Sequence, residues 1–436
     1  MKSFHRTTFY LQHLFLALIL VGCSVPFAQS TPSVTAELPT PTVTVTSSPA
    51  AALEPQGTTT PPGPVTLRVW VPPQFDPAFG TRAGNLFQER LDEFGSRRPG
   101  VRVEVRVKAV DGPGGLLDSL TAASAAAPLA LPDLIALPRA MLEAAALKGL
   151  LHPFEGVTTV MEDPDWYEYS RQLARLQSST FGLPFAGDAL ILVYRPAVIA
   201  APPIDWPAAL QTTGPLVFSA ADQQALFTIA LYQAAGGEIR DDQGRPFLDA
   251  NVLAQVLAFY QEAEQAGLMP YWLTQYQSDN QVWEAFLENR TDLVVTWASR
   301  FLTDLLADTA VAPIPTTNGT SFTLATGWVW ALAAPKPEHQ LLSAQLAEFL
   351  TESSFLAEWT EAAGYLPPRP SALEAWSNTS LQSLIGPVAL SASLYPSTDV
   401  LTSLGPHLEQ ATVAVLKQQI DPLTAAQTAV ANLSGP

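Results

Sequence analysis

The sequence predicts an α/β protein of two lobes, and three observations lead to that fold class. Segments with the alternating pattern of strands are separated along the chain by segments with a helical period. Strands and helices in such alternation form mostly parallel sheets with helices on both faces. The chain has 436 residues, more than one hydrophobic core usually organises. Apolar residues make up 47% and charged residues only 14%, so two sizeable cores can be buried.

The predicted elements begin with a regular series of strands and helices. Residues 65–71 alternate apolar and polar side chains and are rich in β-branched residues, as in a strand. Residues 83–94 have the period of a helix and place Phe87, Leu91 and Phe94 on one face. The same patterns continue as a strand at 101–110, a helix at 116–127, a strand at 132–137, a helix at 140–149 and a strand at 189–195.

A second series of elements follows. It comprises a strand at 214–220, helices at 222–235, 251–267 and 283–287, a strand at 291–297, and later helices at 344–355 and 412–420. Between the first two of these helices the sequence DDQGRPFLD predicts a β-turn, and Asp249 is predicted to cap the helix that follows.

Charge and rare residues exclude several classes of function. Forty acidic and 22 basic residues give a formal net charge of −18, which repels nucleic acid, and no run of Lys or Arg provides a basic face. The single cysteine excludes a disulfide within the chain and a Cys-based metal site. The five histidines do not have the spacing of a metal motif. We therefore expect no metal, no cofactor and no nucleic-acid partner.

Residues 1–23 have the pattern of an export signal. The apolar run from Leu14 to Val21 follows a weakly basic start and is too short to span a bilayer, which takes about 20 apolar residues. It ends in Leu20-Val21-Gly22-Cys23, which resembles the lipobox of bacterial lipoproteins and implies lipidation of Cys23. The alternative is an ordinary signal peptide cleaved after Ala28. Residues 24–64, rich in Thr, Ser and Pro, are predicted to be a disordered linker.

The chain from residue 65 onward resembles the family 1 extracellular solute-binding proteins of bacterial ABC importers, the maltose-binding-protein-like family. The segments that carry this resemblance, in the family's order, are Gly182-Leu183-Pro184-Phe185 with Asp188 and the strand to Tyr194, Pro202 to Trp206, Gly236-Gly237, Phe286 to Asn289, Gly327-Trp328, and Gly364-Tyr365-Leu366-Pro367. The chain departs from the family at Tyr194-Arg195-Pro196, where the usual motif is Tyr-Asn-Lys, and at Ile204-Asp205.

The resemblance implies a two-lobe periplasmic-binding-protein fold with a central, mostly parallel sheet in each lobe. The chain is expected to cross between the lobes near Asp188 to Tyr194 and near Ser321 to Gly327. Lobe 1 would comprise residues 65–188 and 327–372, and lobe 2 residues 189–326 and 373–436. A ligand would bind in the cleft between the lobes and be enclosed by closure of the hinge.

The candidate ligand residues are polar and aromatic side chains near strand ends or in the crossovers. A sugar offers hydroxyl groups to planar polar side chains and apolar faces to aromatic rings. Arg139 and Asp188 are the polar candidates. The structural alternative for Arg139 is a solvated residue that opens a helix, and the alternative for Asp188 is a turn residue. Trp297 and Trp328 resemble the stacking residues of sugar-binding proteins, with burial in a core as the alternative. Weaker aromatic candidates are Phe75, Phe227 and Tyr365.

No pattern of an enzyme is present. Pairs such as Glu262 and Glu264 lie two residues apart on a predicted helix and do not share a face, and the chain has neither a nucleophile elbow nor a phosphate loop. We therefore predict a non-enzymatic, monomeric, lipid-anchored receptor at the cell surface or in the periplasm, which passes a mono- or oligosaccharide to the permease subunits of an ABC transporter. The alternatives are a surface glycan-binding or glycan-active lipoprotein, or a sensor of another small solute. An acidic cleft would favour cations, and the sequence does not place the excess charge.

Overall fold

The computed structural model describes residues 65–434, which belong to one compact unit of the chain. The predicted export signal at 1–23, with Cys23, and the predicted linker at 24–64 lie outside the described residues. No helix within residues 65–434 is long and apolar enough to cross a membrane.

The centre of the fold is one mixed sheet with the strand order β2-β1-β3-β10-β6-β8-β7, with β11 paired to β10 and β9 paired to β6. The strands are β1 (Val65–Val71), β2 (Val101–Val107), β3 (Leu134–Pro138), β6 (Leu183–Tyr194), β7 (Leu216–Val217), β8 (Leu293–Trp297), β9 (Ala310–Ala312), β10 (Thr323–Leu332) and β11 (Ala392–Leu394). A separate small pair is formed by β4 (Arg175–Leu176) and β5 (Ser179–Thr180). Pairs that involve β6, and the pair of β10 with β3, are antiparallel, whereas β1 with β2 and β3, β7 with β8, and β10 with β11 are parallel.

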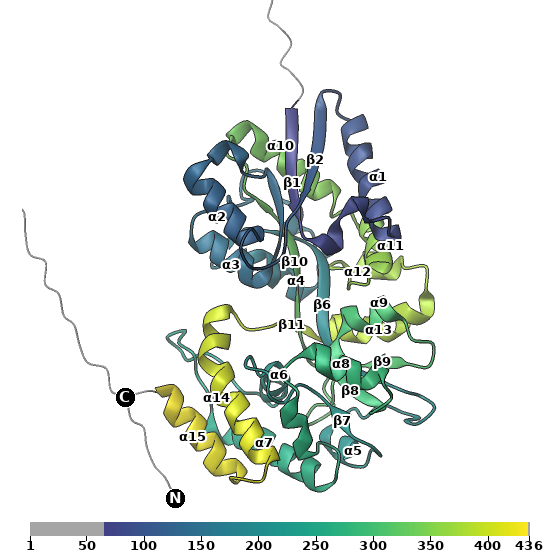
Figure 1. The fold of residues 1–436 in the computed structure, drawn as a ribbon, viewed down its shortest axis with the longest axis vertical. Helices are drawn as coiled ribbons and strands as arrows, with labels where there is room; N and C mark the ends of the chain where they lie inside the picture. Colours follow the sequence, from purple (N-terminus) through teal and green to yellow (C-terminus); the bar gives the residue numbers. More distant parts are fainter. Residues whose placement is uncertain (1–64, 435–436) are drawn as a thin grey trace, which may run out of the picture. The chain divides into compact units, whose positions relative to one another are not determined.

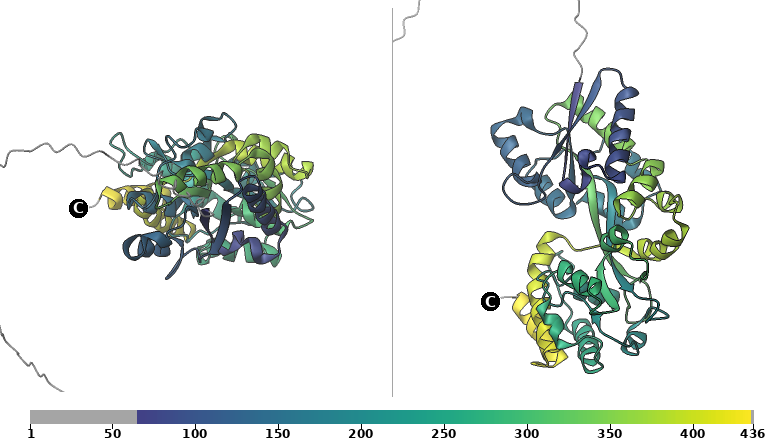
Figure 2. Two further views of the ribbon diagram at one scale, coloured as in Figure 1. Left: turned by 90° about the horizontal axis from the view of Figure 1, so that it is seen from above. Right: turned by 45° about the vertical axis from the view of Figure 1, so that its right-hand side comes forward.

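Helices cover the two ends of this sheet as two lobes (Figure 1). Lobe 1 contains α1 (Arg82–Ser96), α2 (Leu116–Ala126), α3 (Arg139–Leu147), α4 (Glu168–Ala174), α10 (Pro337–Phe349), α11 (Ser353–Ala363) and α12 (Pro370–Glu374). Lobe 2 contains α5 (Trp206–Leu210), α6 (Leu226–Ala234), α7 (Ala250–Gln265), α8 (Asp279–Leu287), α9 (Ala298–Asp304), α13 (Thr379–Ser391), α14 (Thr398–Leu416) and α15 (Pro422–Ser434). Further views show that α14 and α15 lie on lobe 2 (Figure 2). The predicted α/β class with two lobes is confirmed.

Alternation along β1 explains how the sheet of lobe 1 is covered on both faces. Val69 and Val71 belong to one buried cluster together with Phe87 of α1, whereas Trp70 belongs to a second cluster together with Leu142 of α3. Successive side chains of a strand point to opposite faces, so one alternating apolar strand supplies both cores.

Some predicted elements have different bounds in the structure. The predicted helix at 344–355 is interrupted, since α10 ends at Phe349 and α11 begins at Ser353. The residues at the interruption, 351–354, are all polar, and the prediction extended the helix across them. The side chain of Glu352, which precedes α11, forms a salt bridge with Arg90 of α1. By contrast Asp249 caps α7 as predicted, because its carboxylate accepts hydrogen bonds from the backbone N–H groups of Asn251 and Val252.

Two long strands, β6 and β10, run from one lobe into the other. The first part of β6 pairs with β10 in lobe 1, and from Leu190 to Tyr194 it pairs with β8 in lobe 2. Gly187 and Gly327 face each other where the pairing changes, and a Cβ atom on either would lie within 2.5 Å of a neighbouring atom. For Gly327 that atom is the Ala186 carbonyl oxygen of β6, so only glycine allows this approach of the strands, whereas for Gly187 it is the hydroxyl of Tyr169 on α4. Leu366 forms two backbone hydrogen bonds with Gly187, and these bonds hold the 364–367 segment next to the hinge strands.

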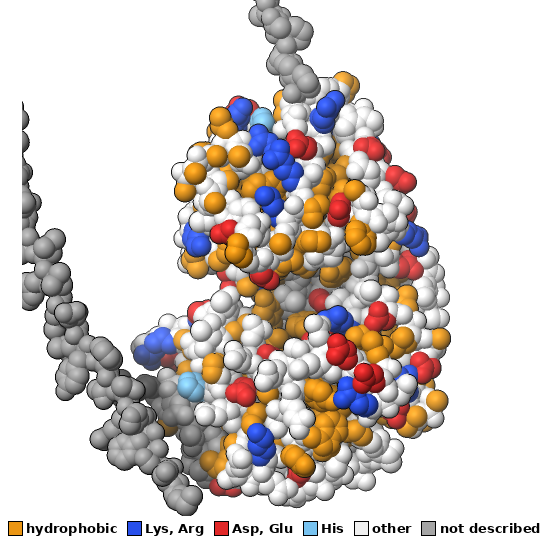
Figure 3. Space-filling view, in the orientation of Figure 1, with side chains coloured by type: hydrophobic (Ala, Val, Ile, Leu, Met, Phe, Trp, Pro, Cys, Tyr) orange, Lys and Arg blue, Asp and Glu red, His pale blue; other side chains and the backbone are white. Residues whose placement is uncertain are grey.

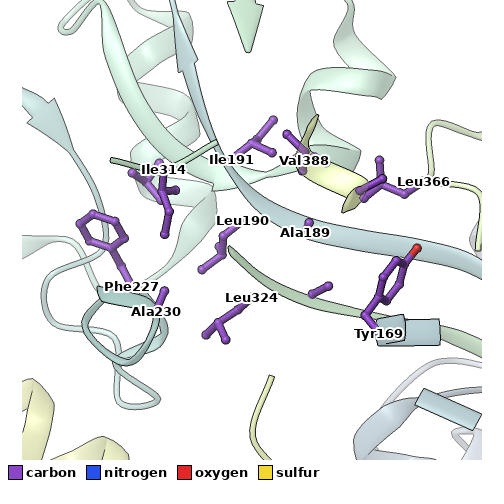
Figure 4. Packing of buried hydrophobic residues seen from close by; sticks show 14 of the residues in the cluster. Tyr169, Ala189, Leu190, Ile191, Phe227, Ala230, Ile314, Leu324, Leu366 and Val388 are labelled. Atoms are coloured by element: carbon purple, nitrogen blue, oxygen red, sulfur yellow. The ribbon is translucent and has the colours of Figure 1, made fainter. Parts of the chain in front are cut away.

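The hydrophobic core is continuous through this hinge. Figure 4 shows Ala189, Leu190 and Ile191 of β6 between Leu366 on one side and Phe227 on the other, and all of these side chains are buried. A third segment joins the lobes after α12, where the chain passes through α13 and β11 into α14, with β11 paired to Thr323–Ala325 of β10. Three closely spaced connections therefore form the hinge.

Candidate functional site

A cavity of about 740 Å³ lies between the two lobes, next to the hinge. Figure 3 shows the surface hollowed between the lobes. Both lobes and both long strands contribute to its walls, which are formed by Gln74, Asp188, Asp279, Trp297, Ser299, Arg300, Thr303, Asp304, Thr326 and Tyr365. Its size lies within the range of about 300–1,000 Å³ that is usual for small-molecule sites.

The junction between β8 and α9 supplies much of one wall. Trp297 is the last residue of β8 and α9 begins at the next residue, so Ser299 and Arg300 lie in the first turn of the helix. Strand β8 pairs with β6, with Trp297 opposite Leu190, and this pairing fixes the strand end beside the hinge. The ring of Trp297 is only partly buried and faces the cavity. An open α/β sheet places ligands at such strand ends.

Asp188 joins the hinge to this wall. Its Oδ1 accepts hydrogen bonds from the backbone N–H groups of Ser299, at 3.0 Å, and Ala189, at 2.9 Å, and its Oδ2 accepts one from the Ser299 hydroxyl at 2.6 Å. Burial nevertheless raises the pKa of Asp188 to about 7, with a smaller effect of the Asp279 charge in the same direction. The carboxyl group therefore titrates near neutral pH, at the point where the two lobes meet.

Acidic groups outnumber basic groups around the cavity. Asp279 accepts hydrogen bonds from the Thr296 hydroxyl at 2.6 Å and from Nε of Arg300 at 3.1 Å. Asp304 accepts one from the Trp283 indole N–H at 2.7 Å. Among residues 65–434, Arg300 is the only basic residue of the cavity wall, and its guanidinium group is already paired with Asp279. The walls therefore retain a net negative charge.

A side pocket of about 220 Å³ opens beside the main cavity and shares Asp279 and Trp297 with it. Phe218 and Phe227 supply aromatic surface, and Asp222 supplies a further carboxylate. Burial raises the pKa of Asp222, and the Asp279 charge adds to the increase. The other residues of the side pocket are Leu190, Ser219, Gln224, Leu226, Gln277, Ser278 and Val295.

The predicted aromatic residues differ in whether they line the main cavity or lie behind its wall. Tyr365 lies in the wall of the main cavity, with its hydroxyl hydrogen-bonded to the Gln74 side chain, and burial raises the pKa of that hydroxyl. Phe75 is 3% exposed and lies 5.2–5.5 Å from four other rings, those of Phe185, Trp328, Trp359 and Tyr365. Trp328 meets Phe75 edge to face and is not part of the cavity wall. Phe75 and Trp328 thus support the wall from behind.

Arg139 lies away from the cavity, contrary to the expectation that its guanidinium group would meet a ligand. Its side chain is 10% exposed and forms an ion pair with Glu143, with Nε and Oε1 2.7 Å apart. Its Nη1 donates to the backbone carbonyl groups of Gln172, Leu173 and Arg175. These partners engage Nε and Nη1, and Arg139 is not part of the cavity wall, so we leave it out of the proposed site.

Several wall residues were missed by the sequence reasoning. Ser299 and Arg300 directly follow a predicted strand, and the same rule that suggested Arg139 could have suggested them. Gln74, Asp279 and Thr326 carry no local signal, because only the packing of the lobes brings them to one cavity. Within residues 65–434 no group of three or more His, Cys, Asp or Glu side chains is placed to hold a metal ion.

Residues 89–382, more than half of the chain, match the family model described as bacterial extracellular solute-binding protein. The chain belongs to this family. This confirms the resemblance found in the sequence, and it identifies a binding protein and not an enzyme. Membership of an extracellular family also agrees with a location outside the cytoplasmic membrane.

Solved structures of solute-binding proteins share the fold. A cyclo/maltodextrin-binding protein complexed with maltotetraose has a TM-score of 0.70 and 21% identity, with 85% of this chain and 96% of that chain covered. The sugar-binding protein MalE from Xanthomonas citri has a TM-score of 0.70 and 18% identity over the same shares of the two chains. A solute-binding protein from Thermotoga lettingae bound with α-D-tagatose has a TM-score of 0.61 and 20% identity, with 84% and 98% covered. No curated protein sequence matches the chain.

Proposed function

We propose that this solute-binding protein captures a mono- or oligosaccharide in the interlobe cavity and delivers it to the permease of an ABC transporter. The observation that carries the proposal is the wall around Trp297. A partly exposed indole ring there is surrounded by the carboxylates of Asp188 and Asp279 and by the guanidinium group of Arg300. Such a set offers a flat apolar surface to one face of a sugar ring and planar polar groups to its hydroxyls.

Several features of the cavity support this assignment of the ligand class. Thr326, Thr303 and Gln74 add hydroxyl and amide groups to the wall, and Tyr365 adds a second ring. Small-molecule sites combine apolar surface with a few placed polar groups in this way. The sugar-binding proteins with the same fold make a carbohydrate the first ligand class to test.

The charge of the cavity favours a second candidate, a cationic solute such as a polyamine. The described residues of the main cavity and side pocket include four carboxyl groups, those of Asp188, Asp222, Asp279 and Asp304, and a single guanidinium group, so the charge is negative even with Asp188 protonated. A cavity with this balance attracts cations and repels anions. Anionic sugars such as uronates are therefore expected to bind poorly.

Thermal unfolding in the presence of a ligand panel distinguishes these candidates. The panel contains neutral mono- and oligosaccharides, polyamines, amino acids, peptides and uronates. A ligand of the folded state at about 100 times its Kd adds roughly 2.7 kcal/mol to the free energy of unfolding, which raises Tm by several degrees. An increase with neutral sugars and without product formation supports the first candidate. An increase with polyamines alone replaces it by the second.

We also propose that Cys23 carries a lipid that holds the protein on the outer side of a membrane. The support is the Leu20-Val21-Gly22-Cys23 sequence, in which the only cysteine of the chain follows a short apolar run. Several acyl chains anchor a protein stably where one chain does not. Cys23→Ala is expected to move the protein from the membrane fraction to the soluble fraction, and unchanged partitioning would contradict lipid anchoring.

A further inference from the structure

Arg139 and Glu143 form a buried ion pair on α3 in lobe 1. Their side chains are 10% and 9% exposed. Arg139 also donates to three backbone carbonyl groups at 2.7–3.0 Å, at the end of α4 and in β4. The ion pair and these three hydrogen bonds hold the Glu143 carboxylate in a fixed position. The ion pair uses only Oε1 of Glu143.

The other oxygen of Glu143 reaches into lobe 2. Its Oε2 accepts hydrogen bonds from the backbone N–H of Thr398 at 3.1 Å and from the Thr398 hydroxyl at 2.9 Å. Thr398 is the first residue of α14, a 19-residue helix that packs against α6, α7 and α15. The free N–H groups and the dipole at a helix N-terminus favour a carboxylate. Glu143 therefore connects Arg139 in lobe 1 with the start of a long helix in lobe 2.

This connection lies beside the hinge and close to the cavity wall. Tyr395, three residues before Thr398, donates its backbone N–H to the carbonyl of Ala325 in β10 and shares a side-chain hydrogen bond with Thr326. Thr326 belongs to the cavity wall and lies opposite Asp188 in the β10–β6 pair. A shift of the segment before α14 would therefore reach both long hinge strands.

We propose that Arg139, Glu143 and Thr398 form an interlobe clasp that fixes the third connection of the hinge and thereby sets how far the lobes separate before a ligand binds. Glu143 is a positioning residue in this role, since it lies outside the cavity wall. The effect of the clasp on ligand affinity rests on the proposed function, whereas its effect on the separation of the lobes does not.

The test compares hydroxyl deletions at two positions of α14 in the full-length protein. Thr398→Val removes the hydroxyl that donates to Glu143. Thr402→Val, one turn later, removes a hydroxyl that donates only to the Thr398 carbonyl within the same helix. Thr398→Ser keeps the donor. Spin labels on cysteines introduced at the exposed Leu129 in lobe 1 and Leu423 in lobe 2, in a Cys23→Ser background, report the distance distribution between the lobes.

Without ligand, Thr398→Val and Glu143→Gln are expected to broaden the distance distribution, while Thr398→Ser and Thr402→Val leave it as in the parent protein. For a ligand identified by thermal shift, Thr398→Val is expected to raise Kd by about 2- to 10-fold, the effect of one hydrogen bond. Unchanged distributions in both Thr398→Val and Glu143→Gln would overturn the clasp, even if Glu143→Gln lowered Tm. Failure of every sugar to bind would overturn the proposed function and leave the distance test valid.

Discussion

Two strand-to-helix junctions, one in each lobe, have the same local structure and different roles. In lobe 1, β3 ends at Pro138 and α3 begins with Arg139, and in lobe 2, β8 ends at Trp297 and α9 carries Arg300 in its first turn. The Arg139 side chain is 10% exposed and is bound by protein groups, whereas the Arg300 side chain is 42% exposed and faces the cavity. A strand end therefore identifies candidate positions, and the packing around each strand end decides which of them meets a ligand.

The largest effect is expected from Arg139→Gln. The substitution leaves the Glu143 carboxylate buried without its partner and removes donors from three carbonyl groups. Breaking a buried ion pair from one side typically costs about 3–5 kcal/mol. Urea unfolding should show a loss of that order in the free energy of unfolding. A loss below about 1 kcal/mol would mean that the lobe 1 junction does not depend on this pair.

A smaller but more specific effect is expected from Trp297→Ala. Loss of the ring that faces both the main cavity and the side pocket should weaken ligand binding by about 2 kcal/mol or more, roughly 30-fold in Kd. Isothermal titration with the ligand found by thermal shift measures the change. Trp328→Phe is the control, because Trp328 packs against Phe75 outside the cavity wall and should mainly affect Tm. Equal losses of affinity in both variants would contradict stacking on Trp297.

Asp188 should give the protein a pH dependence that Asp188→Asn removes. The unfolded carboxyl releases its proton near pH 4, whereas the folded group, with its pKa raised to about 7, keeps it. The unfolded state thus binds fewer protons between these values, so the free energy of unfolding falls from about pH 4 to about pH 7. Urea unfolding at pH 6 and pH 8 should show a fall that is smaller in Asp188→Asn by about 1 kcal/mol. An equal fall in both proteins would indicate that the carboxyl is not desolvated.

The smallest change in stability is expected from Arg300→Gln, the substitution matched to Arg139→Gln. The pair of Arg300 with Asp279 is partly exposed, and such pairs typically contribute less than about 1 kcal/mol. Urea unfolding should therefore show little loss in the free energy of unfolding. Loss of the guanidinium group also makes the cavity more acidic, so the affinity for cations should rise relative to the affinity for neutral ligands. A loss as large as that of Arg139→Gln would remove the contrast between the two junctions.

Local patterns predicted most of the elements and missed most of the cavity wall. Burial of one face gives residues 65–71 their alternation and residues 83–94 their helical period. Each pattern is visible in a stretch of about ten residues. Strand β6 begins at Leu183, earlier than its apolar run indicates, because Gly187 and Asp188 are kept in the strand by pairing with β10. The interruption between α10 and α11 was also missed, although residues 351–354 are all polar.

The sequence by itself determined the α/β class and the family, because these depend on periodicity and on motifs of adjacent residues. It also singled out Asp188, Trp297 and Tyr365, which the structure places in the cavity wall and whose roles toward a ligand stay predictions. Only the tertiary structure decided that Arg139 binds the backbone carbonyl groups of Gln172, Leu173 and Arg175 and that Asp279 faces the cavity. The physical reason is that the partners of a polar side chain come from segments far away in the chain, and no local pattern records which of them folding brings close.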